Sequence, residues 1–151
     1  TTLFPIWYGA QSRLNGYHTA LKSAGIRSLA EAEGDWTAQS GYSATKTMFR
    51  QYDFTALVAG NDQMALGAIR ALADLGKRVP EDVSVIGFDD IPEAEFFLPA
   101  LTTIKQEFRL LGKMGIEYLI HIINDPDSAN GQQIITPELV IRQSTAQPAK
   151  R

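Results

Sequence analysis

The chain has 151 residues, of which 44% are hydrophobic, so it can bury one core and we expect one domain. Its formal net charge of -3 and its pI near 5.3 give no basic surface for nucleic acid. The absence of cysteine excludes thiol catalysis, thiolate metal sites and disulfides, and it fits a reducing cytosol. The apolar start over residues 1–8 has no basic leader and is too short to span a bilayer, so we expect a core strand there and no membrane contact.

The first half of the chain alternates helix and strand patterns. We expect a helix from about Gln11 to Ala24, a short edge strand within 27–33, and a second helix from about Ser40 to Gln51. Arg13 lies in the first turn of the first helix, where its charge opposes the helix dipole. It is therefore either a solvated surface cation or a guanidinium aimed at a ligand. Trp36, in the turn before the second helix, either covers nearby core or stacks on a sugar or base.

The middle of the chain predicts a strand, a polar loop, a helix, a second strand and a second polar loop. Strands are expected at Thr55–Ala59 and Val83–Phe88, because nearly continuous apolar runs are typical of strands buried on both faces. The helix between them, from Gln63 to about Leu75, makes a βαβ unit with parallel strands. In such α/β sheets ligands bind beyond the carboxyl ends of the strands, where Asn61 and Asp89 lie. We therefore place the candidate site there.

The last third of the chain is expected to be less regular. Residues 91–99, between two prolines, predict a short helical turn whose adjacent aromatics plug the core. Leu101–Ile104 is an extended segment, and a long helix follows from about Glu107 to Asn124. The apolar stretch over 134–141 contains a proline, which predicts a kinked or edge pair of strands. The polar tail from Ser144 to Arg151 is expected to fray.

Apolar residues at three-and-four spacing predict a buried side for the first of these helices and an apolar side on the last. In the first helix the stripe consists of Leu14, Tyr17 and Leu21. On the last helix the apolar side consists of Phe108, Leu111, Met114 or Gly115, Tyr118 or Leu119, and Ile122.

The sequence contains no catalytic signature. There is no glycine-rich phosphate loop and no nucleophile elbow, and the two histidines, His18 and His121, have no neighbouring acid at ligand spacing. Asp89 and Asp90 could bind Mg²⁺ as a pair, or one of them could cap the next turn. We therefore expect no enzyme, no cofactor and no resident metal.

What remains is a polar set at the strand ends with aromatic residues near it, namely Arg13, Asn61, Asp89, Gln106, Trp36 and Phe108. Carboxylate, amide and guanidinium groups offer paired donors or acceptors to vicinal hydroxyls, and aromatic rings cover the apolar face of a sugar. This combination predicts recognition of a hydroxyl-rich small molecule without turnover.

Four segments carry a more specific signal: Glu33–Trp36, Asn61–Ala68, Gly87–Asp90 and Pro99–Gln106. In this order and spacing they resemble the lactose/galactose-repressor family of bacterial transcription regulators, over about Gln11 to Thr145. The resemblance implies a periplasmic-binding-protein-like effector domain with two α/β subdomains and a ligand cleft between them. It places this chain in the C-terminal half, as a parallel sheet with helices on both faces.

By motif match the resemblance implies six effector-binding positions, namely Arg13, Trp36, Asn61, Asp89, Gln106 and Phe108. Among them, Trp36 is implied to stack on the sugar, and Asn61 and Asp89 are implied to bind its hydroxyls. Gln106 and Phe108 match crossover positions that approach the ligand.

The resemblance also implies a domain organisation. Residues 1–104 are expected to form the effector-binding subdomain, 105–143 a crossover helix and terminal strands, and 144–151 a polar tail. The family binds operator DNA as a homodimer through a helix-turn-helix headpiece, which this sequence does not contain. Operator DNA is therefore an expected partner only of a longer, cytoplasmic protein.

Two other functions stay open on the sequence alone. A stand-alone carbohydrate-binding protein of the same superfamily would use the same fold, although a signal peptide is expected for that class. A doubly wound enzyme or phospho-acceptor module would use Asp89 and Asp90 with Mg²⁺.

Overall fold

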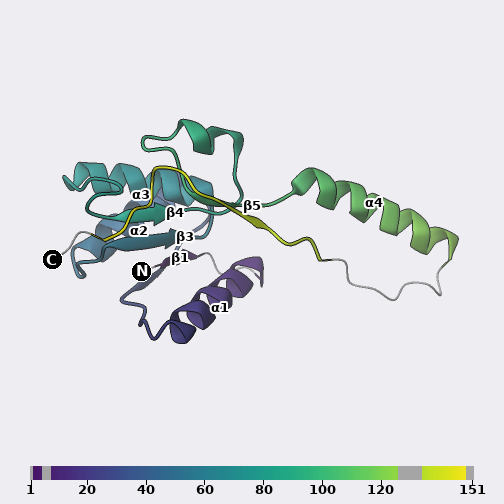
Figure 1. Ribbon diagram of the computed structural model, residues 1–151, viewed down its shortest axis with the longest axis horizontal. Coiled ribbons are helices and arrows are strands. Elements are labelled where there is room, and N and C mark those ends of the chain that lie inside the picture. The colour runs from purple at the N-terminus through teal and green to yellow at the C-terminus, as the bar shows by residue number, and fades with distance from the viewer. Residues whose placement is uncertain (1, 5–7, 126–133, 149–151) are drawn as a thin grey trace.

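The structure, a computed structural model, describes residues 2–4, 8–125 and 134–148. Its body is a parallel sheet in the order β2-β1-β3-β4, with α2 and α3 on one face and α1 on the other (Figure 1). The strands are β1 (Thr2–Phe4), β2 (Glu31–Glu33), β3 (Ala56–Ala59) and β4 (Ser84–Ile86). The helices are α1 (Tyr8–Ser23), α2 (Ala38–Phe49) and α3 (Asp62–Asp74). The parallel pairing of each strand with its neighbours confirms the expected α/β class, with β2 at an edge.

The core lies between the sheet and the α2–α3 layer. Along β3, Leu57 and Ala59 are fully buried, while Ala56 and Val58 point toward α1 and are less covered. The buried side chains of this layer include Met48, Leu57, Met64, Ala68, Leu72 and Val85. This layer positions the N-terminus of α3 at the carboxyl end of β3.

Two glycines allow α2 and α3 to approach closely. A Cβ at Gly67 would overlap the carbonyl oxygen of Ala38, and one at Gly41 would overlap the backbone of Met64. Each helix therefore meets the backbone of the other at a glycine, and any side chain there would push the two helices apart.

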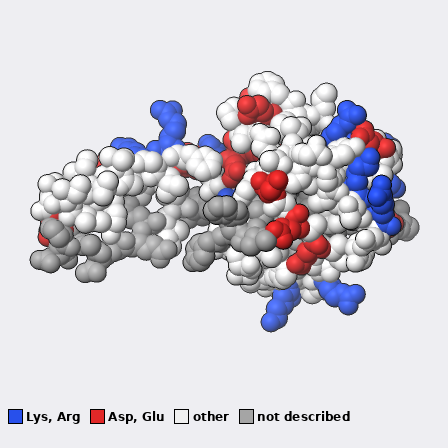
Figure 2. Space-filling view, turned by 180° about the vertical axis from the view of Figure 1, so that it is seen from behind, with Lys and Arg blue, Asp and Glu red and all other residues white. Residues whose placement is uncertain are grey.

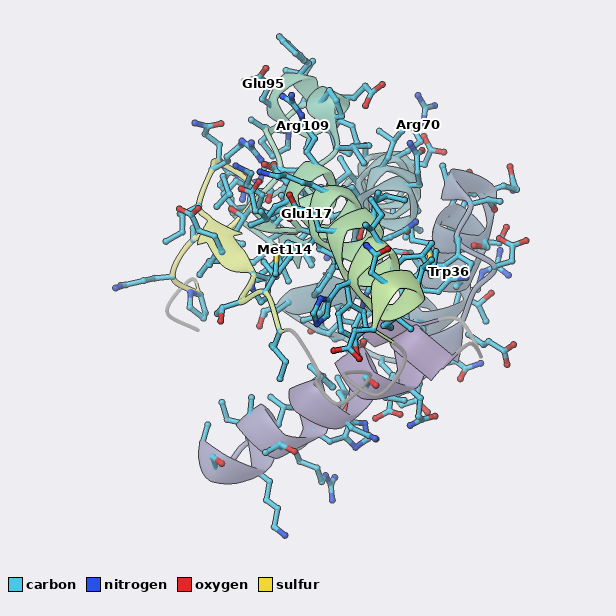
Figure 3. All side chains as sticks on the ribbon, turned by 90° about the vertical axis from the view of Figure 1, so that its right-hand side faces the viewer. Trp36, Arg70, Glu95, Arg109, Met114 and Glu117 are labelled. Carbon is cyan, nitrogen blue, oxygen red and sulfur yellow. The ribbon has the colours of Figure 1, made fainter. Side chains whose placement is uncertain are left out.

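A second, antiparallel ribbon leaves the body at the carboxyl ends of the sheet. It pairs β5 (Thr103–Lys105) with β6 (Glu138–Val140), and α4 (Phe108–Asn124) projects from it (Figure 1). No residue of α4 is buried. On the face seen in Figure 2, most of the surface of this projection is uncharged. Figure 3 turns the projection toward the viewer and labels Arg109, Met114 and Glu117 on α4.

One predicted burial pattern is wrong. The stripe of α1, residues Leu14, Tyr17 and Leu21, is only half-buried, because α1 stands over the less covered face of the sheet. The apolar side of α4, by contrast, is not covered: its residues are exposed or half-buried, because no other element of the described chain packs over them. Among the described helices, none is long and apolar enough to cross a membrane.

The short helical turn η1 (Pro92–Phe96) forms as expected, but its aromatics divide. Phe97 is buried in the core, whereas Phe96 is 76% exposed. The expected strand at Ile134–Ile135 is absent, and of the predicted terminal pair only β6 forms.

The tail does not fray where it begins. Ser144 is buried, its hydroxyl donates to the carbonyl of Val85, and the amide of Val85 donates back to the carbonyl of Ser144. The hydroxyl of Ser144 also accepts from the amide of Thr102. Residues after β6 therefore return to the body and extend its hydrogen bonding beside β4.

Candidate functional site

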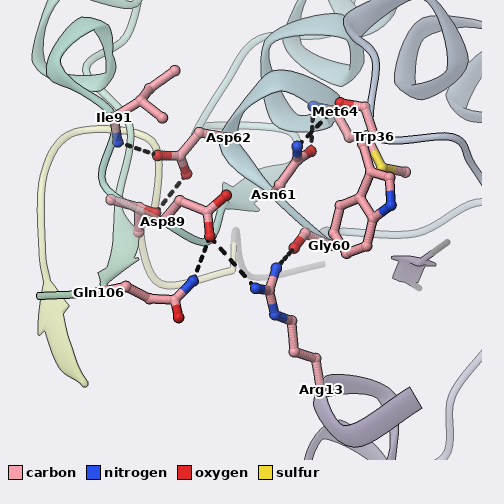
Figure 4. Close-up of polar contacts among 10 residues, drawn as sticks. Arg13, Trp36, Gly60, Asn61, Asp62, Met64, Asp89, Ile91 and Gln106 are labelled. Atoms are coloured by element: carbon pink, nitrogen blue, oxygen red, sulfur yellow. Dashed lines mark hydrogen bonds and ion pairs between the residues drawn. The ribbon is translucent and has the colours of Figure 1, made fainter. Parts of the chain in front are cut away.

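Polar side chains from five segments meet beyond the carboxyl ends of β3 and β4 (Figure 4). The segments are the start of α1, the loop before α2, the β3–α3 corner, the β4–η1 bend and the end of β5. They bring together Arg13, Trp36, Asn61, Asp89 and Gln106. Five of the six predicted site residues therefore share one edge of the sheet.

Asp89 is the centre of the cluster. Its Oδ1 accepts a hydrogen bond of 2.6 Å from Gln106 Nε2 and lies 3.5 Å from Arg13 Nη2. The side chains of Arg13 and Asp89 are 20% and 21% exposed. Burial raises the pKa of Asp89, while the bond from Gln106 and the charge of Arg13 act in the opposite direction. Since the contacts with Gln106 and Arg13 both fall on Oδ1, Oδ2 is the oxygen best placed to accept from a ligand.

Arg13 is held before any ligand arrives. Its Nη1 donates to the carbonyl oxygen of Gly60 at 2.6 Å. Its guanidinium carbon lies 3.9 Å from the ring centre of Phe88 and 5.4 Å from that of Trp36. Burial lowers the pKa of Arg13, against the charges of Asp89 and Asp62. Arg13 is thus a fixed, part-buried cation rather than a solvated one.

Asn61 has a structural task as well as a place at the site. It is the N-cap of α3, where its Oδ1 accepts from the amide of Met64 at 2.9 Å. Its Nδ2 donates to the carbonyl of Trp36 at 3.0 Å, and this bond holds Trp36 in a left-handed conformation with φ of 73°. One N–H of the amide is left to reach a ligand.

The two carboxylates after β4 have different partners. Asp90 Oδ1 lies 2.8 Å from Arg142 Nη2, and both side chains are less than one-fifth exposed. Arg142, from the segment after β6, also donates to the carbonyl of Leu101. Asp90 is therefore tied to the chain that follows the projection, while Asp89 faces Arg13.

Phe108 stands apart from the other five predicted residues. It begins α4, is 55% exposed, and its amide donates to the carbonyl of Gln106. Among the described residues, no hydrogen bond, ion pair or ring contact joins its side chain to the cluster. Its assignment to the site stays a prediction.

Sequence reasoning missed Phe88, Asp62 and Arg142. The sequence predicts Phe88 as the end of a strand, yet its ring stacks on Arg13. Neither Asp62 nor Arg142 stands out from the local pattern as a site residue. Their contacts join residues between 26 and 75 positions apart, such as Asp62 with Phe88 and Arg13 with Phe88, so local patterns do not show them.

The arrangement suits binding better than metal chemistry. Among the described residues, no three carboxylate or histidine side chains are placed to hold a metal ion. His18 lies 2.8 Å from a single carboxylate, that of Glu31, on the surface. The cluster offers a carboxylate oxygen, a guanidinium, two amides and two aromatic rings, which are the groups that recognise hydroxyls on a ring-shaped ligand.

Comparison with known proteins identifies the family of the chain. The family model for the periplasmic binding protein-like domain matches residues 7–145. The lactose operon repressor of Escherichia coli K12 is 42% identical over 140 residues, which cover 92% of this chain and 39% of that protein. The transcriptional repressor PurR of Edwardsiella ictaluri is 41% identical over 137 residues, covering 89% and 40%.

Solved structures agree as well. A lac repressor dimer bound to operator and the anti-inducer ONPF has a TM-score of 0.92 at 40% identity, covering 96% of this chain and 51% of that one. A complex of the transcriptional regulator CelR with cellobiose has a TM-score of 0.89 at 32% identity, covering 95% and 46%. The chain spans about two fifths of the length of the curated repressors that it matches. It belongs to the family of periplasmic binding protein-like domains, in the branch of the lactose/galactose repressors.

Proposed function

We propose that this chain is the effector-sensing part of a cytoplasmic bacterial transcription repressor. It binds a sugar or a similar hydroxyl-rich molecule, and this binding alters the affinity of the whole dimeric protein for operator DNA. The single observation that carries the proposal is the cluster of Arg13, Asp89 and Gln106 beside Trp36. These groups are part-buried and oriented by contacts within the protein, so little conformational entropy remains to be lost on binding.

The relatives support the class of ligand and the role. One matched structure holds cellobiose, and another holds operator DNA together with ONPF. The relatives found are repressors rather than enzymes. A Mg²⁺-dependent activity is disfavoured because Asp90 is paired with Arg142, and Asp89 with Gln106 and Arg13.

Ligand-induced stabilisation tests the proposal. The full polypeptide that carries this chain is heated with lactose, galactose, glucose or cellobiose, and separately with Mg²⁺. At a hundredfold excess over the dissociation constant, a bound sugar raises the unfolding free energy by about 2.7 kcal/mol. A shift with at least one sugar and none with Mg²⁺ supports the proposal. A shift with Mg²⁺ alone would replace it with the phospho-acceptor or enzyme alternative.

A further inference from the structure

Asp62 is a buried carboxylate directly behind the site. It begins α3 and is 0% exposed. Its Oδ2 accepts from the amide of Ile91 at 2.9 Å, and its Oδ1 accepts from the hydroxyl of Thr103 at 2.5 Å. Its own amide donates to the carbonyl of Phe88 at 2.9 Å. One residue thus binds the chain on both sides of Asp89 and Asp90, and binds β5 as well (Figure 4).

The bend between these contacts has an unusual backbone. Asp89 has φ of 119° and Asp90 has φ of 58°, in a region that residues with a Cβ seldom adopt. Such conformations persist only when the surroundings hold them. The bonds from Asp62 to Phe88 and to Ile91 close the bend immediately before and after the two strained residues.

The hydrogen bond between Thr103 and Asp62 holds β5 beside Asp89, the carboxylate proposed to bind the ligand. Thr103 begins β5, and Gln106, which donates to Asp89, follows just beyond the end of that strand. The amide of Asp89 also donates to the carbonyl of Ile104. A Cβ at Gly87 would overlap Asp62 Oδ1, so the glycine leaves the space that the carboxylate occupies.

Placing a carboxylate here is unfavourable in itself. Burial raises the pKa of Asp62, the bonds from Thr103 and Ile91 act against that rise, and the charges of Asp89 and Asp90 add to it. On the opposite side Arg13 is the facing cation. This cost is offset by the two hydrogen bonds that the Asp62 carboxylate accepts from separate segments.

We propose that Asp62 is a positioning residue for effector binding, whose carboxylate holds the 88–91 bend against β5 so that Asp89 and Gln106 meet in the orientation that a ligand needs. This inference rests on the proposed function, in which Asp89 binds the effector. Asp62 itself does not touch the ligand and acts through Asp89.

The claim that Asp62 holds the 88–91 bend against β5 can be tested without ligand. Amide hydrogen exchange is followed in the full polypeptide for wild type, Asp62→Ala, Asp62→Asn and Thr103→Val. We expect Asp89 and Ile91 to exchange at least tenfold faster in Asp62→Ala. In Asp62→Asn the exchange rates of these two amides should rise by no more than about threefold. The side-chain amide of the asparagine can still accept from the Ile91 N–H and can donate to the Thr103 hydroxyl.

Thr45→Val is the matched control, since Thr45 is also a fully buried threonine but lies in α2. It should leave exchange in the bend unchanged. If Asp62→Ala does not fold, Thr103→Val breaks one of the two side-chain contacts at nearly constant volume and should accelerate exchange at Asp89. Unchanged exchange at Asp89 in every folded Asp62 and Thr103 variant would overturn the inference.

A double-mutant cycle tests whether Asp62 affects ligand binding through Asp89. The affinity for the strongest binder among lactose, galactose and cellobiose is measured for Asp62→Ala in the wild-type and in the Asp89→Ala background. We expect a loss of at least tenfold in the first background and less than twofold in the second. Equal losses would show general damage and overturn the inference. Failure of wild type to bind any of the three sugars would contradict the proposed function, and the exchange experiment would then decide the role of Asp62 alone.

Discussion

Two carboxylates with raised pKa values lie beside each other at the candidate site, and they have separate tasks. Asp89 is part-buried and points toward Arg13, while Asp62 is enclosed and bound to backbone and hydroxyl donors. For both, loss of solvent is the main cause of the raised pKa. Both therefore destabilise the fold when ionised, and the fold retains them for the contacts that they make.

The raised pKa of Asp62 predicts a pH dependence with a definite sign. The unfolded chain releases this proton first, near the usual value of 3.8, so stability falls as the pH rises from there through the folded pKa. Asp62→Asn removes this loss. Measured by denaturant unfolding between about pH 3 and pH 7, the stability of Asp62→Asn relative to wild type should rise with pH.

Asp74 supplies a control of opposite sign. The hydrogen bond from Tyr42 is the main cause that lowers its pKa, so its contribution is present above the usual value and is lost as the pH falls through the folded pKa. Asp74→Asn should lose stability relative to wild type as the pH rises. The same slope for both variants would contradict the assignment.

At the scale of elements, the contact between α2 and α3 determines where the site is built. The N-termini of these helices carry Thr37 and Asn61 as caps, and the Asn61 side chain bonds to the carbonyl of Trp36. The close approach at Gly67 and Gly41 therefore fixes the distance between the Trp36 loop and the β3–α3 corner.

Gly67→Ala should separate these two helices. Because the new methyl group would overlap the carbonyl of Ala38, we expect a loss of about 1–3 kcal/mol in unfolding free energy. Gly16→Ala is the control, since Gly16 lies within α1 with no atom near its Cβ position. That change should be neutral or stabilise by up to about 1 kcal/mol. Equal effects of the two changes on thermal unfolding would refute the close-packing argument.

The sequence predicted the elements of the body well because each has a local signal. Apolar runs marked β3 and β4, and the polar residues that follow these runs marked the start of α3 and the end of β4 within a few residues. The carboxyl-end rule then placed Asn61 and Asp89 at one edge, where the structure has them.

Other features could not be predicted from local sequence patterns. The left-handed bend at Asp89 and Asp90 depends on Asp62, and the position of Arg13 depends on the ring of Phe88. Each of these contacts joins segments that are distant in the chain. The half-buried stripe of α1 likewise reflects how little covers its face of the sheet, which helical periodicity does not report.

On the scale of the whole molecule, α4 is the element whose apolar surface is left most exposed among the described residues. It projects from the body and carries seven exposed large apolar side chains, namely Phe108, Leu110, Leu111, Ile116, Leu119, Ile120 and Ile123. Burying one such side chain stabilises by about 1.5–3 kcal/mol. Contiguous exposed apolar surface of this kind is typical of an interface. The matched repressor structures are about twice as long as the part that this chain covers.

We therefore predict that the 151-residue chain on its own associates through α4. Sedimentation at low micromolar concentration should show dimers or larger species, and Leu119→Glu should shift them toward monomer. Ile26→Glu is the control, because Ile26 is similarly exposed but lies after α1. A single monomeric species with cooperative unfolding would contradict this prediction.

Arg13 and Asp89 are the residues proposed to bind the effector, and calorimetric titration of the full polypeptide measures their contribution. Lactose, galactose, glucose and cellobiose are titrated into wild type, Arg13→Ala, Asp89→Ala and, as a control, Arg70→Ala, whose side chain is 73% exposed on α3. Loss of one charge-assisted hydrogen bond should weaken binding by about 1.5–3 kcal/mol, roughly ten- to a hundredfold. We predict this loss in both site variants and wild-type affinity in the control. Wild-type affinity in Asp89→Ala or Arg13→Ala would contradict the proposal.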